Sequence, residues 1–331
     1  MGELWQKLIW YPVLERYISR HYTVYPCLAL SWTHQPAKNA DEHTLAPHTN
    51  SQKRKTMSIL YDMPAKEYFA ADAFGSTSIR HLSDPEISLQ EVKYLIEHDE
   101  HKKAYDVGTL AHALILEGSL DHLVVEVPFD TYHKNEAKEM RDAAYASGLV
   151  PLKTPELDSI LGPVEAMRDA VMSHSIAAEL FTDHEPEVSI FWEQDEVPMK
   201  ARIDALHQTE RIAVDLKTIR SARPNEVRKQ ISNLGYYIQA RDYLNGLKAV
   251  TGDDFDWYFV MVQSAEPYTV SVHQLTPEAL DDAQIRIDHA IDRYKQAQQT
   301  GWTGYPEVFT QELTPWEAIK NEDLLDEGIT V

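Results

Sequence analysis

Hydrophobic and polar residues recur along this chain with two different periods, which divide it into helical and β-rich parts. Apolar residues spaced three or four apart predict helices over residues 76–82, 89–98 and 134–182. Pro151 and Pro155 are expected to separate the last of these into two helices. The segment from Gly108 to Gly118 is apolar almost all round, which is typical of a helix buried in a core.

Short segments rich in β-branched and aromatic residues begin after residue 186, with turn-forming residues between them. We expect strands at 187–193, 199–206, 211–218, 256–263 and 268–274. A long helix is expected from Pro224 to about Leu247, and Thr276-Pro277 should open a final amphipathic helix that ends near Gln299. This order of elements predicts an α/β (α+β) fold in which helices pack against a sheet.

Three parts of the chain differ in character. Residues 1–56 begin with an aromatic stretch and end in a polar segment without periodicity, so an N-terminal appendage and a flexible linker are expected. Residues 57–305 contain the predicted strands and helices and are expected to form the globular domain. Residues 306–331 are expected to form an acidic C-terminal tail.

Composition narrows the class of protein. With 43% hydrophobic and 25% charged residues, the chain has the profile of a soluble globular protein. No uncharged apolar run reaches the roughly 18–20 residues that span a bilayer, and the N-terminus lacks a signal-peptide pattern, so we expect a cytoplasmic protein without a membrane partner. The single cysteine, Cys27, excludes an internal disulfide and an iron–sulfur cluster held by one chain.

The net charge of −22 argues at first sight against a nucleic-acid partner, because phosphates demand positive potential. The charge is unevenly distributed, however. Between Met199 and Arg241 there are nine Lys and Arg against four Asp and Glu, a balance of +5 that leaves −27 for the rest of the chain. Such a stretch could guide a polyanion to one place on an acidic body, or it could be a chance cluster on a solvated face.

Two acidic residues and one lysine are expected to converge in the middle of the predicted sheet. Asp204 and Asp215 lie on consecutive strands, and a turn near Thr209 would place them opposite each other. Lys217 is two residues beyond Asp215, so it emerges on the same face of the same strand. Carboxylate oxygens at this spacing suit Mg²⁺ or Mn²⁺, either of which can activate a water molecule for phosphodiester hydrolysis.

The alternative interpretation is a surface hairpin with a common Asp–Lys ion pair. The second strand argues against it, because Ala213, Val214 and Leu216 are apolar and indicate burial. Acids that face a core without a partner are costly, so a functional site is favoured.

Several short motifs, taken together, resemble those of the PD-(D/E)XK nucleases. Asp204, followed by Asp215-Leu216-Lys217, is similar to their D…(D/E)-x-K core. The flanking motifs narrow the resemblance to the RecE-type (exodeoxyribonuclease VIII-like) and RecB-type phage exonucleases. These motifs occur in the order of that group and cover roughly residues 60–300. They are the "G-T-x-x-H" helix at Gly108–His112, the "K-x-R-x-D" strand at Lys200–Asp204, the "Q-x-x-x-Y" helix at Gln239–Tyr243, and Glu187 one strand earlier.

The resemblance implies a restriction-endonuclease-like core, with a central mixed sheet flanked by helices. It also implies a role for each matched residue. The expected metal ligands are His112, Asp204, Asp215 and the carbonyl of Leu216. The expected catalytic residues are Asp204, Asp215, Lys217, Gln239, Tyr243 and Glu187, with Lys217 assisting the attacking water. Taken without the resemblance, His112 is better explained as a buried core residue than as a ligand, and the alternative for Gln239 and Tyr243 is a packing stripe.

Phosphate contacts are expected from the basic stretch that surrounds these motifs. The candidate DNA-binding residues are Lys200, Arg202, Arg220, Arg223, Arg228, Lys229 and Arg241. Any one of them could also be a plain surface charge.

The expected function is that of a Mg²⁺-dependent exodeoxyribonuclease, with Mn²⁺ substituting and no iron–sulfur cluster. The RecE-type resemblance implies that it degrades one strand from double-stranded DNA ends, 5′→3′, in a bacterial or phage-infected cell. It further implies phage or prophage recombination, a homo-oligomeric ring, and a RecT-like single-strand annealing partner. The alternatives are an endonuclease or single-strand-specific nuclease on the same core, and a non-catalytic acidic protein that mimics DNA.

Overall fold

We describe the protein from a computed structural model, which covers residues 57–98, 104–306 and 308–326. The predicted appendage and linker at residues 1–56 lie outside these described residues. No helix in the part that the structure describes is long and apolar enough to cross a membrane.

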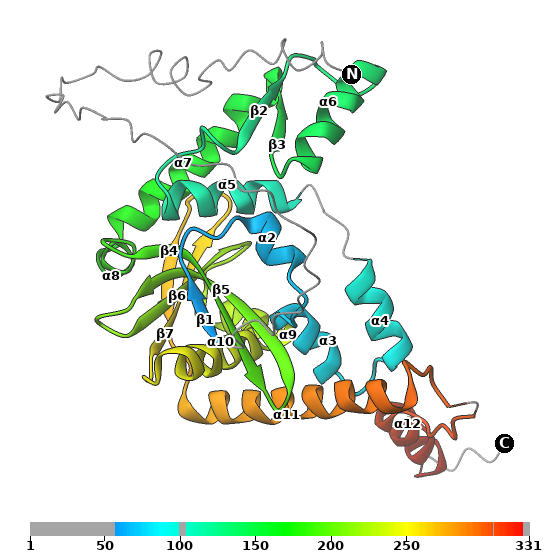
Figure 1. The fold of residues 1–331 in the computed structure, drawn as a ribbon. Helices are drawn as coiled ribbons and strands as arrows, with labels where there is room; N and C mark the ends of the chain where they lie inside the picture. Colours follow the sequence, from blue (N-terminus) through cyan, green and yellow to red (C-terminus); the bar gives the residue numbers. More distant parts are fainter. Residues whose placement is uncertain (1–56, 99–103, 307, 327–331) are drawn as a thin grey trace, which may run out of the picture.

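A six-stranded mixed sheet forms the centre of the molecule (Figure 1). In spatial order its strands are β1 (Ser58–Leu60), β4 (Glu185–Gln194), β5 (Val197–His207), β6 (Ile212–Ile219), β7 (Asp256–Gln263) and β8 (Val270–His273). Strands β6 and β7 pair in parallel and every other neighbouring pair is antiparallel. The predicted fold class and all five predicted strands are confirmed, and the short edge strand β1 was not predicted.

Helices cover both faces of the sheet, and Figure 1 shows them above and below it. The helices on one face are α3 (Ser76–Ser83), α10 (Tyr236–Thr251) and α11 (Pro277–Thr300), and those on the other are α5 (Ala104–Leu116) and α7 (Leu157–Ser173). Helix α4 (Leu89–Glu97) packs beside α3. A short helix, α2 (Ala65–Ala70), precedes α3 in the chain. The sheet therefore has a hydrophobic core on each side.

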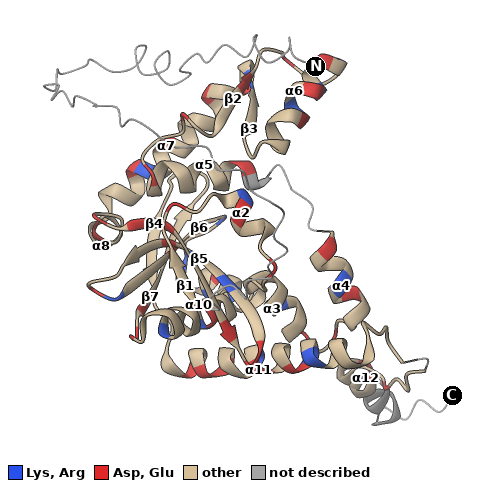
Figure 2. Cartoon of the chain, in the orientation of Figure 1, with Lys and Arg blue, Asp and Glu red and all other residues tan. Residues whose placement is uncertain are grey.

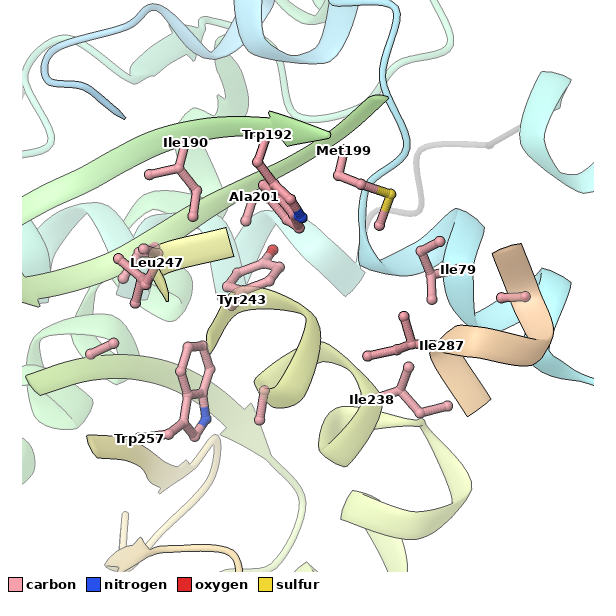
Figure 3. Close-up of a cluster of buried hydrophobic side chains, with 14 of the residues drawn as sticks. Ile79, Ile190, Trp192, Met199, Ala201, Ile238, Tyr243, Leu247, Trp257 and Ile287 are labelled. Atoms are coloured by element: carbon pink, nitrogen blue, oxygen red, sulfur yellow. The ribbon is translucent and has the colours of Figure 1, made fainter. Parts of the chain in front are cut away.

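The core under α10 is built from large side chains that meet across a close helix–sheet contact. Figure 3 shows Ile190 and Trp192 of β4 facing Tyr243 and Leu247 of α10. Gly246 lies at this contact, where an added Cβ would come within 2.7 Å of the Trp192 ring and 2.8 Å of Ile190. The absence of a side chain at Gly246 is what lets the helix approach the sheet.

The segment between residues 117 and 184 contains the two predicted helices, α6 (Asn135–Ala146) and α7, with Pro151 and Pro155 between them. It also contains elements that were not predicted, among them the short helix α8 (Ser175–Leu180). Two short strands, β2 (Val124–Val127) and β3 (Val150–Lys153), pair in parallel as a separate small sheet. Pro151 thus lies in a strand, where the apolar run Val150–Leu152 is buried in the second core. Periodicity alone does not separate such a short apolar run from a segment of a buried helix.

The prediction of one long helix after Pro224 is wrong. The segment forms two helices, α9 (Pro224–Asn233) and α10, which are separated by Leu234 and Gly235. Gly235 has φ +69°, and a Cβ there would meet Arg80 at 2.8 Å. The break redirects the chain so that α10 begins at Tyr236 and lies flat against the sheet.

The predicted acidic tail contains a further helix, α12 (Pro315–Asp326), beyond the C-terminal end of α11. Helix α5 begins one turn earlier than predicted, at Ala104 instead of Gly108. Helix α3 begins as predicted at Ser76, and Gly75 is its N-cap.

The close contact at Gly246 predicts that Gly246→Ala destabilises the fold. An added methyl group would overpack the contact with Trp192, and we expect the free energy of unfolding to fall by about 1–3 kcal/mol. Ala in place of Gly ordinarily stabilises a helix, so the sign of the change reports the packing. Urea unfolding would measure it, with Lys248→Ala, an exposed change on the same helix, as the control. Unchanged or increased stability of Gly246→Ala would contradict this account.

A second prediction concerns Asp242 of α10, which is fully buried and whose carboxylate oxygens have no hydrogen-bond partner among the described residues. Burial raises the pKa of Asp242 well above its usual value. Because the pKa of Asp242 is raised in the folded state, this residue contributes stability below the pKa of the unfolded state. That contribution is lost as pH rises toward the pKa of the folded state. Asp242→Asn should therefore become more stable relative to wild type between pH 4 and pH 7. Thermal unfolding across that range would test it; parallel pH curves for the two proteins would show that burial does not shift this group.

Candidate active site

The site lies where two strands of the central sheet separate. Strands β5 and β6 pair over three residues only, from His207–Ile212 to Ala205–Val214. Asp204 and Asp215 come next in this register, where the ladder stops. Instead of a backbone pair, the Leu216 N–H donates to Asp204 Oδ2 at 2.7 Å. The predicted placement of the two aspartates opposite each other therefore agrees with the register, and the carboxylate of Asp204 occupies the gap between the strands.

Glu187 joins Asp204 from the neighbouring strand through a local distortion. The β4–β5 ladder has no pair between Glu187 and Asp204, although pairs exist on both sides. Glu187 has φ +53°, a left-handed conformation that is costly for a residue with a Cβ. Its carboxylate is held by the guanidinium of Arg202, which also donates to the carbonyl of Met63 at 2.8 Å and to Ser189 Oγ at 3.0 Å. Backbone strain and an arginine brace together fix the position of this carboxylate.

His112 of α5 approaches Asp204 from the face of the sheet that α5 and α7 cover. Its Nδ1 lies 3.6 Å from Asp204 Oδ2. One turn earlier on α5, a Cβ on Gly108 would come within 3.3 Å of Thr218 Oγ1 on β6, so Gly108 allows the helix to lie close to the strand. Burial, and secondarily Lys217, lowers the pKa of His112 to about 4. The imidazole is therefore neutral at physiological pH and offers a lone pair to a metal.

His112, Glu187 and Asp204 each present a ligand atom, and these atoms lie within 4.8 Å of one another. Imidazole nitrogen and carboxylate oxygen are donors that suit Mn²⁺, and Mg²⁺ favours the carboxylates. Burial and the nearby Asp215 carboxylate raise the pKa of Asp204 well above its usual value. A cation among these groups would offset that repulsion, so the residues fit a divalent metal.

Asp215 is held differently from the way the sequence suggests. Its Oδ1 accepts from Lys217 Nζ at 2.9 Å and from Gln239 Nε2 of α10 at 2.8 Å, and its Oδ2 lies 2.8 Å from Lys217 Nζ. Burial raises the pKa of Asp215, while Lys217 and Gln239 oppose the shift. Among the described residues, the metal-ligand group includes Glu187 in place of Asp215. The roles of Asp215 and the Leu216 carbonyl as ligands remain predictions.

Lys217 is charged and restrained at the edge of this cluster. Burial lowers its pKa, but the carboxylates of Asp215 and Asp204 outweigh burial and raise it above the usual value. The Lys217 ammonium also lies 4.9 Å from the centre of the Tyr236 ring, a cation–π contact. The sequence places Tyr236 on the helix face of Gln239 but gives no sign of this contact, which depends on where α10 begins.

Tyr243 is buried one turn beyond Gln239, and its ring packs edge-on against Trp257 with centroids 5.6 Å apart. Burial raises its pKa to about 12, and its hydroxyl is hydrogen-bonded to Ser76 at the start of α3. The structure thus brings together His112, Glu187, Asp204, Asp215, Lys217 and Gln239, and places Tyr243 behind them in the core.

The predicted DNA-contact residues fall into two groups. Lys200 is buried and donates to the carbonyls of Tyr68 at 3.0 Å, Phe69 at 3.3 Å and Ala71 at 2.9 Å, so it binds the C-terminal end of α2 instead of facing solvent. Arg202 holds Glu187, and Arg241 donates to Gln284 of α11 at 2.8 Å. The exposed group comprises Arg220, Arg223, Arg228 and Lys229, at the end of β6 and along α9. Lys229 pairs with Glu226 Oε1 at 3.0 Å, and the four exposed side chains are accessible to phosphates in this structure.

The match to a protein family agrees with this fold. Residues 76–305 match the family described as a PDDEXK-like domain of unknown function (DUF3799). A proposed exonuclease from Eubacterium rectale superposes with a TM-score of 0.55 at 13% identity, covering 77% of this chain and 97% of its own. A phage-related exonuclease from Haemophilus somnus gives a TM-score of 0.30 at 12% identity, covering 69% and 95%. No curated protein sequence matches the chain significantly.

The arginine brace predicts a specific effect on metal binding. Arg202→Met should release the Glu187 carboxylate and weaken Mn²⁺ binding about 10–100-fold, the usual loss when the partner of a metal ligand is removed. Titration calorimetry or electron paramagnetic resonance with Mn²⁺ would measure the affinity.

Lys200→Met provides the matched control, since Lys200 is two residues away on the same strand and contacts the backbone carbonyls of α2 and the Tyr68 ring. We expect it to lower the melting temperature while preserving the Mn²⁺ affinity. Equal affinities for Arg202→Met and wild type would mean that Glu187 is not a ligand or needs no brace.

Proposed function

Since this chain belongs to the PDDEXK-like family matched by residues 76–305, and so to the PD-(D/E)XK nuclease superfamily, we propose that it is a divalent-metal-dependent exodeoxyribonuclease acting on linear double-stranded DNA. The observation that carries the proposal is the cluster in the gap between β5 and β6. There, a neutral histidine, three carboxylates and one ammonium converge from four separate elements.

His112, Glu187 and Asp204 would hold the metal, with Asp215 beside them. Bound there, Mg²⁺ or Mn²⁺ would supply Lewis-acid polarisation of a phosphate oxygen and activation of a water molecule. The protein keeps His112 unprotonated through burial, so this nitrogen does not have to lose a proton at neutral pH before it binds.

Lys217 supplies the positive charge at the reacting phosphate. Its raised pKa keeps the ammonium protonated throughout the physiological range. Asp215 and the Tyr236 ring restrict its position, and Gln239 in turn holds Asp215. A preorganised charge of this kind stabilises negative charge that develops in the transition state without reorganisation during the reaction.

The electrostatics of the surface support a confined path for DNA. Acidic side chains are spread along α11 and α6 (Figure 2), whereas the exposed cations Arg220, Arg223, Arg228 and Lys229 follow directly after the strand of Lys217. A polyanion would be repelled by most of the body and attracted near the end of β6.

Exonuclease action, and not internal cleavage, is proposed on the RecE-type resemblance of the motifs, and the Eubacterium rectale protein of the same fold is also described as a proposed exonuclease. The 5′→3′ polarity, the recombination role and the RecT-like annealing partner rest on the RecE-type resemblance of the motifs. These belong to the proposal, as does a bacterial or phage-infected cytoplasm as the location.

Linear duplex DNA labelled separately at each 5′ and 3′ end, incubated with Mg²⁺, Mn²⁺ or EDTA, tests the proposal. Wild type should degrade one strand in either metal and be inactive in EDTA. We expect Asp204→Asn and Lys217→Met to lose on the order of 10²–10³-fold in rate or more. Asp281→Asn and Lys248→Met, exposed changes of the same kinds on α11 and α10, should retain wild-type rates.

The substrate comparison separates the alternatives. Cleavage of a covalently closed circle would indicate an endonuclease, and degradation of single strands alone a single-strand-specific enzyme. A folded protein that binds no Mn²⁺ and cleaves no DNA would overturn the proposal and favour the non-catalytic acidic protein.

A further inference from the structure

The segment after α11 exposes every described side chain from Val308 to Lys320. Large apolar side chains are among them, including Val308 at 81% and Trp316 at 76% exposed, together with Phe309, Leu313 and Ile319. We call residues 305–326 the C-terminal arm. Its helix α12 has 12 residues, a length at which an isolated helix is marginal in water. The arm therefore lacks the surface that would bury its apolar side chains.

The base of the arm is fixed to the body of the protein. Gln90 N–H of α4 donates to the Thr303 carbonyl at 2.9 Å, and the Tyr305 hydroxyl donates to the Glu86 carbonyl at 2.9 Å. A further contact at 3.0 Å joins the same hydroxyl to Glu91 Oε2. Figure 1 shows the arm leaving at the C-terminal end of α11, beside α4. Its direction is thus set by the fold.

A groove with complementary character lies at the other end of α11. It encloses about 690 Å³ between α9, the end of β8 and the first turns of α11. Ile231, Leu275 and Ile285 are among its apolar residues, and Ile285 is 66% exposed. Arg228 and Arg286 line the groove, against one acid, Asp282. It combines apolar contact area with a net positive charge in an otherwise acidic protein.

The arm has the opposite charge. Residues 305–326 contain six Asp and Glu and one lysine. Glu312 precedes Leu313 and Glu317 follows Trp316, so acids flank two exposed apolar side chains of the described arm. Apolar side chains between carboxylates fit an apolar groove that two arginines line.

The arm and the groove of one molecule are far apart. The groove uses residues 279–286 of α11, whereas the arm begins beyond its last residue, Thr300. A 24-residue helix is about 36 Å long. Because the arm and the groove lie at opposite ends of one rigid helix, they are better placed to contact each other between neighbouring molecules than within one molecule.

We propose that the C-terminal arm docks into the α9–α11 groove of a second copy of this chain. Such a contact is heterologous, because each copy offers an arm at one end and a groove at the other. Heterologous contacts form a closed ring when the rotation between copies closes, and an open filament when it does not.

Sedimentation equilibrium of the full chain, without DNA or metal, tests the contact. Wild type should be larger than a monomer at micromolar concentration. Trp316→Asp in the arm and Ile285→Asp in the groove should each give a monomer, and both positions are exposed enough to leave the fold intact. Ile176→Asp, at an exposed isoleucine of α8 outside the groove, should behave as wild type.

A mixing experiment tests the head-to-tail geometry. The Trp316→Asp copy keeps its groove and the Ile285→Asp copy keeps its arm, so the mixture should form one-to-one dimers and nothing larger. Reversing the charges in one chain, with Arg228→Glu and Glu312→Arg, should restore part of the association that Arg228→Glu alone removes.

Three results would overturn the inference. Wild type could be monomeric at all concentrations, both variants could keep the wild-type mass, or the arm could resist protease in a monomer, which would indicate docking within one chain. None of these measurements uses nuclease activity, so a protein that fails to associate leaves the proposed function unaffected. A protein that associates but lacks nuclease activity leaves this inference unaffected.

Discussion

The hydrogen bond from the Leu216 N–H to Asp204 Oδ2 occupies the place of the next backbone pair between β5 and β6. If the ladder continued, the strands would close and the carboxylates would have no common space. β6 keeps its full pairing with β7, and β5 pairs with β4 on both sides of the interruption at Glu187 and Asp204, so the sheet remains continuous at its sides while it opens in the middle. A buried gap lined by backbone dipoles and carboxylates is a costly arrangement in a core, and the two hydrophobic layers must offset that cost.

The two layers also decide which groups can enter the gap. On one face, Gly108 lets α5 lie against β6 so that His112 reaches Asp204. On the other, the break at Gly235 starts α10 where Tyr236 and Gln239 can meet Lys217 and Asp215. Both glycines allow a close approach or a left-handed turn that another residue would resist. Site geometry in this protein is therefore set by how nearly two helices can approach one strand pair.

Sequence reasoning located Asp204, Asp215 and Lys217 because period-2 alternation and a short turn determine which residues of a hairpin are opposite. It could not find the brace on Glu187, since that depends on a left-handed residue within a strand and on an arginine whose partners are Met63 and Ser189. It also assigned Lys200 to phosphate contact, because charge in a sequence does not reveal that three carbonyls of a distant helix surround the ammonium. The local sequence pattern was sufficient to predict the fold, whereas contacts between distant residues decide which charged side chains remain available to phosphates.

That distinction changes the meaning of the charge balance. The +5 stretch between Met199 and Arg241 includes Lys200, Arg202 and Lys217, whose charges are used inside the protein. The outward-facing cations are then few and sit on α9 and its approach, against a body that is strongly acidic. A surface of this kind binds polyanions weakly unless the cations of several copies face one common space. Acidic exteriors with a basic passage arise naturally when identical subunits meet head to tail, because each repeats the same few cations around one axis.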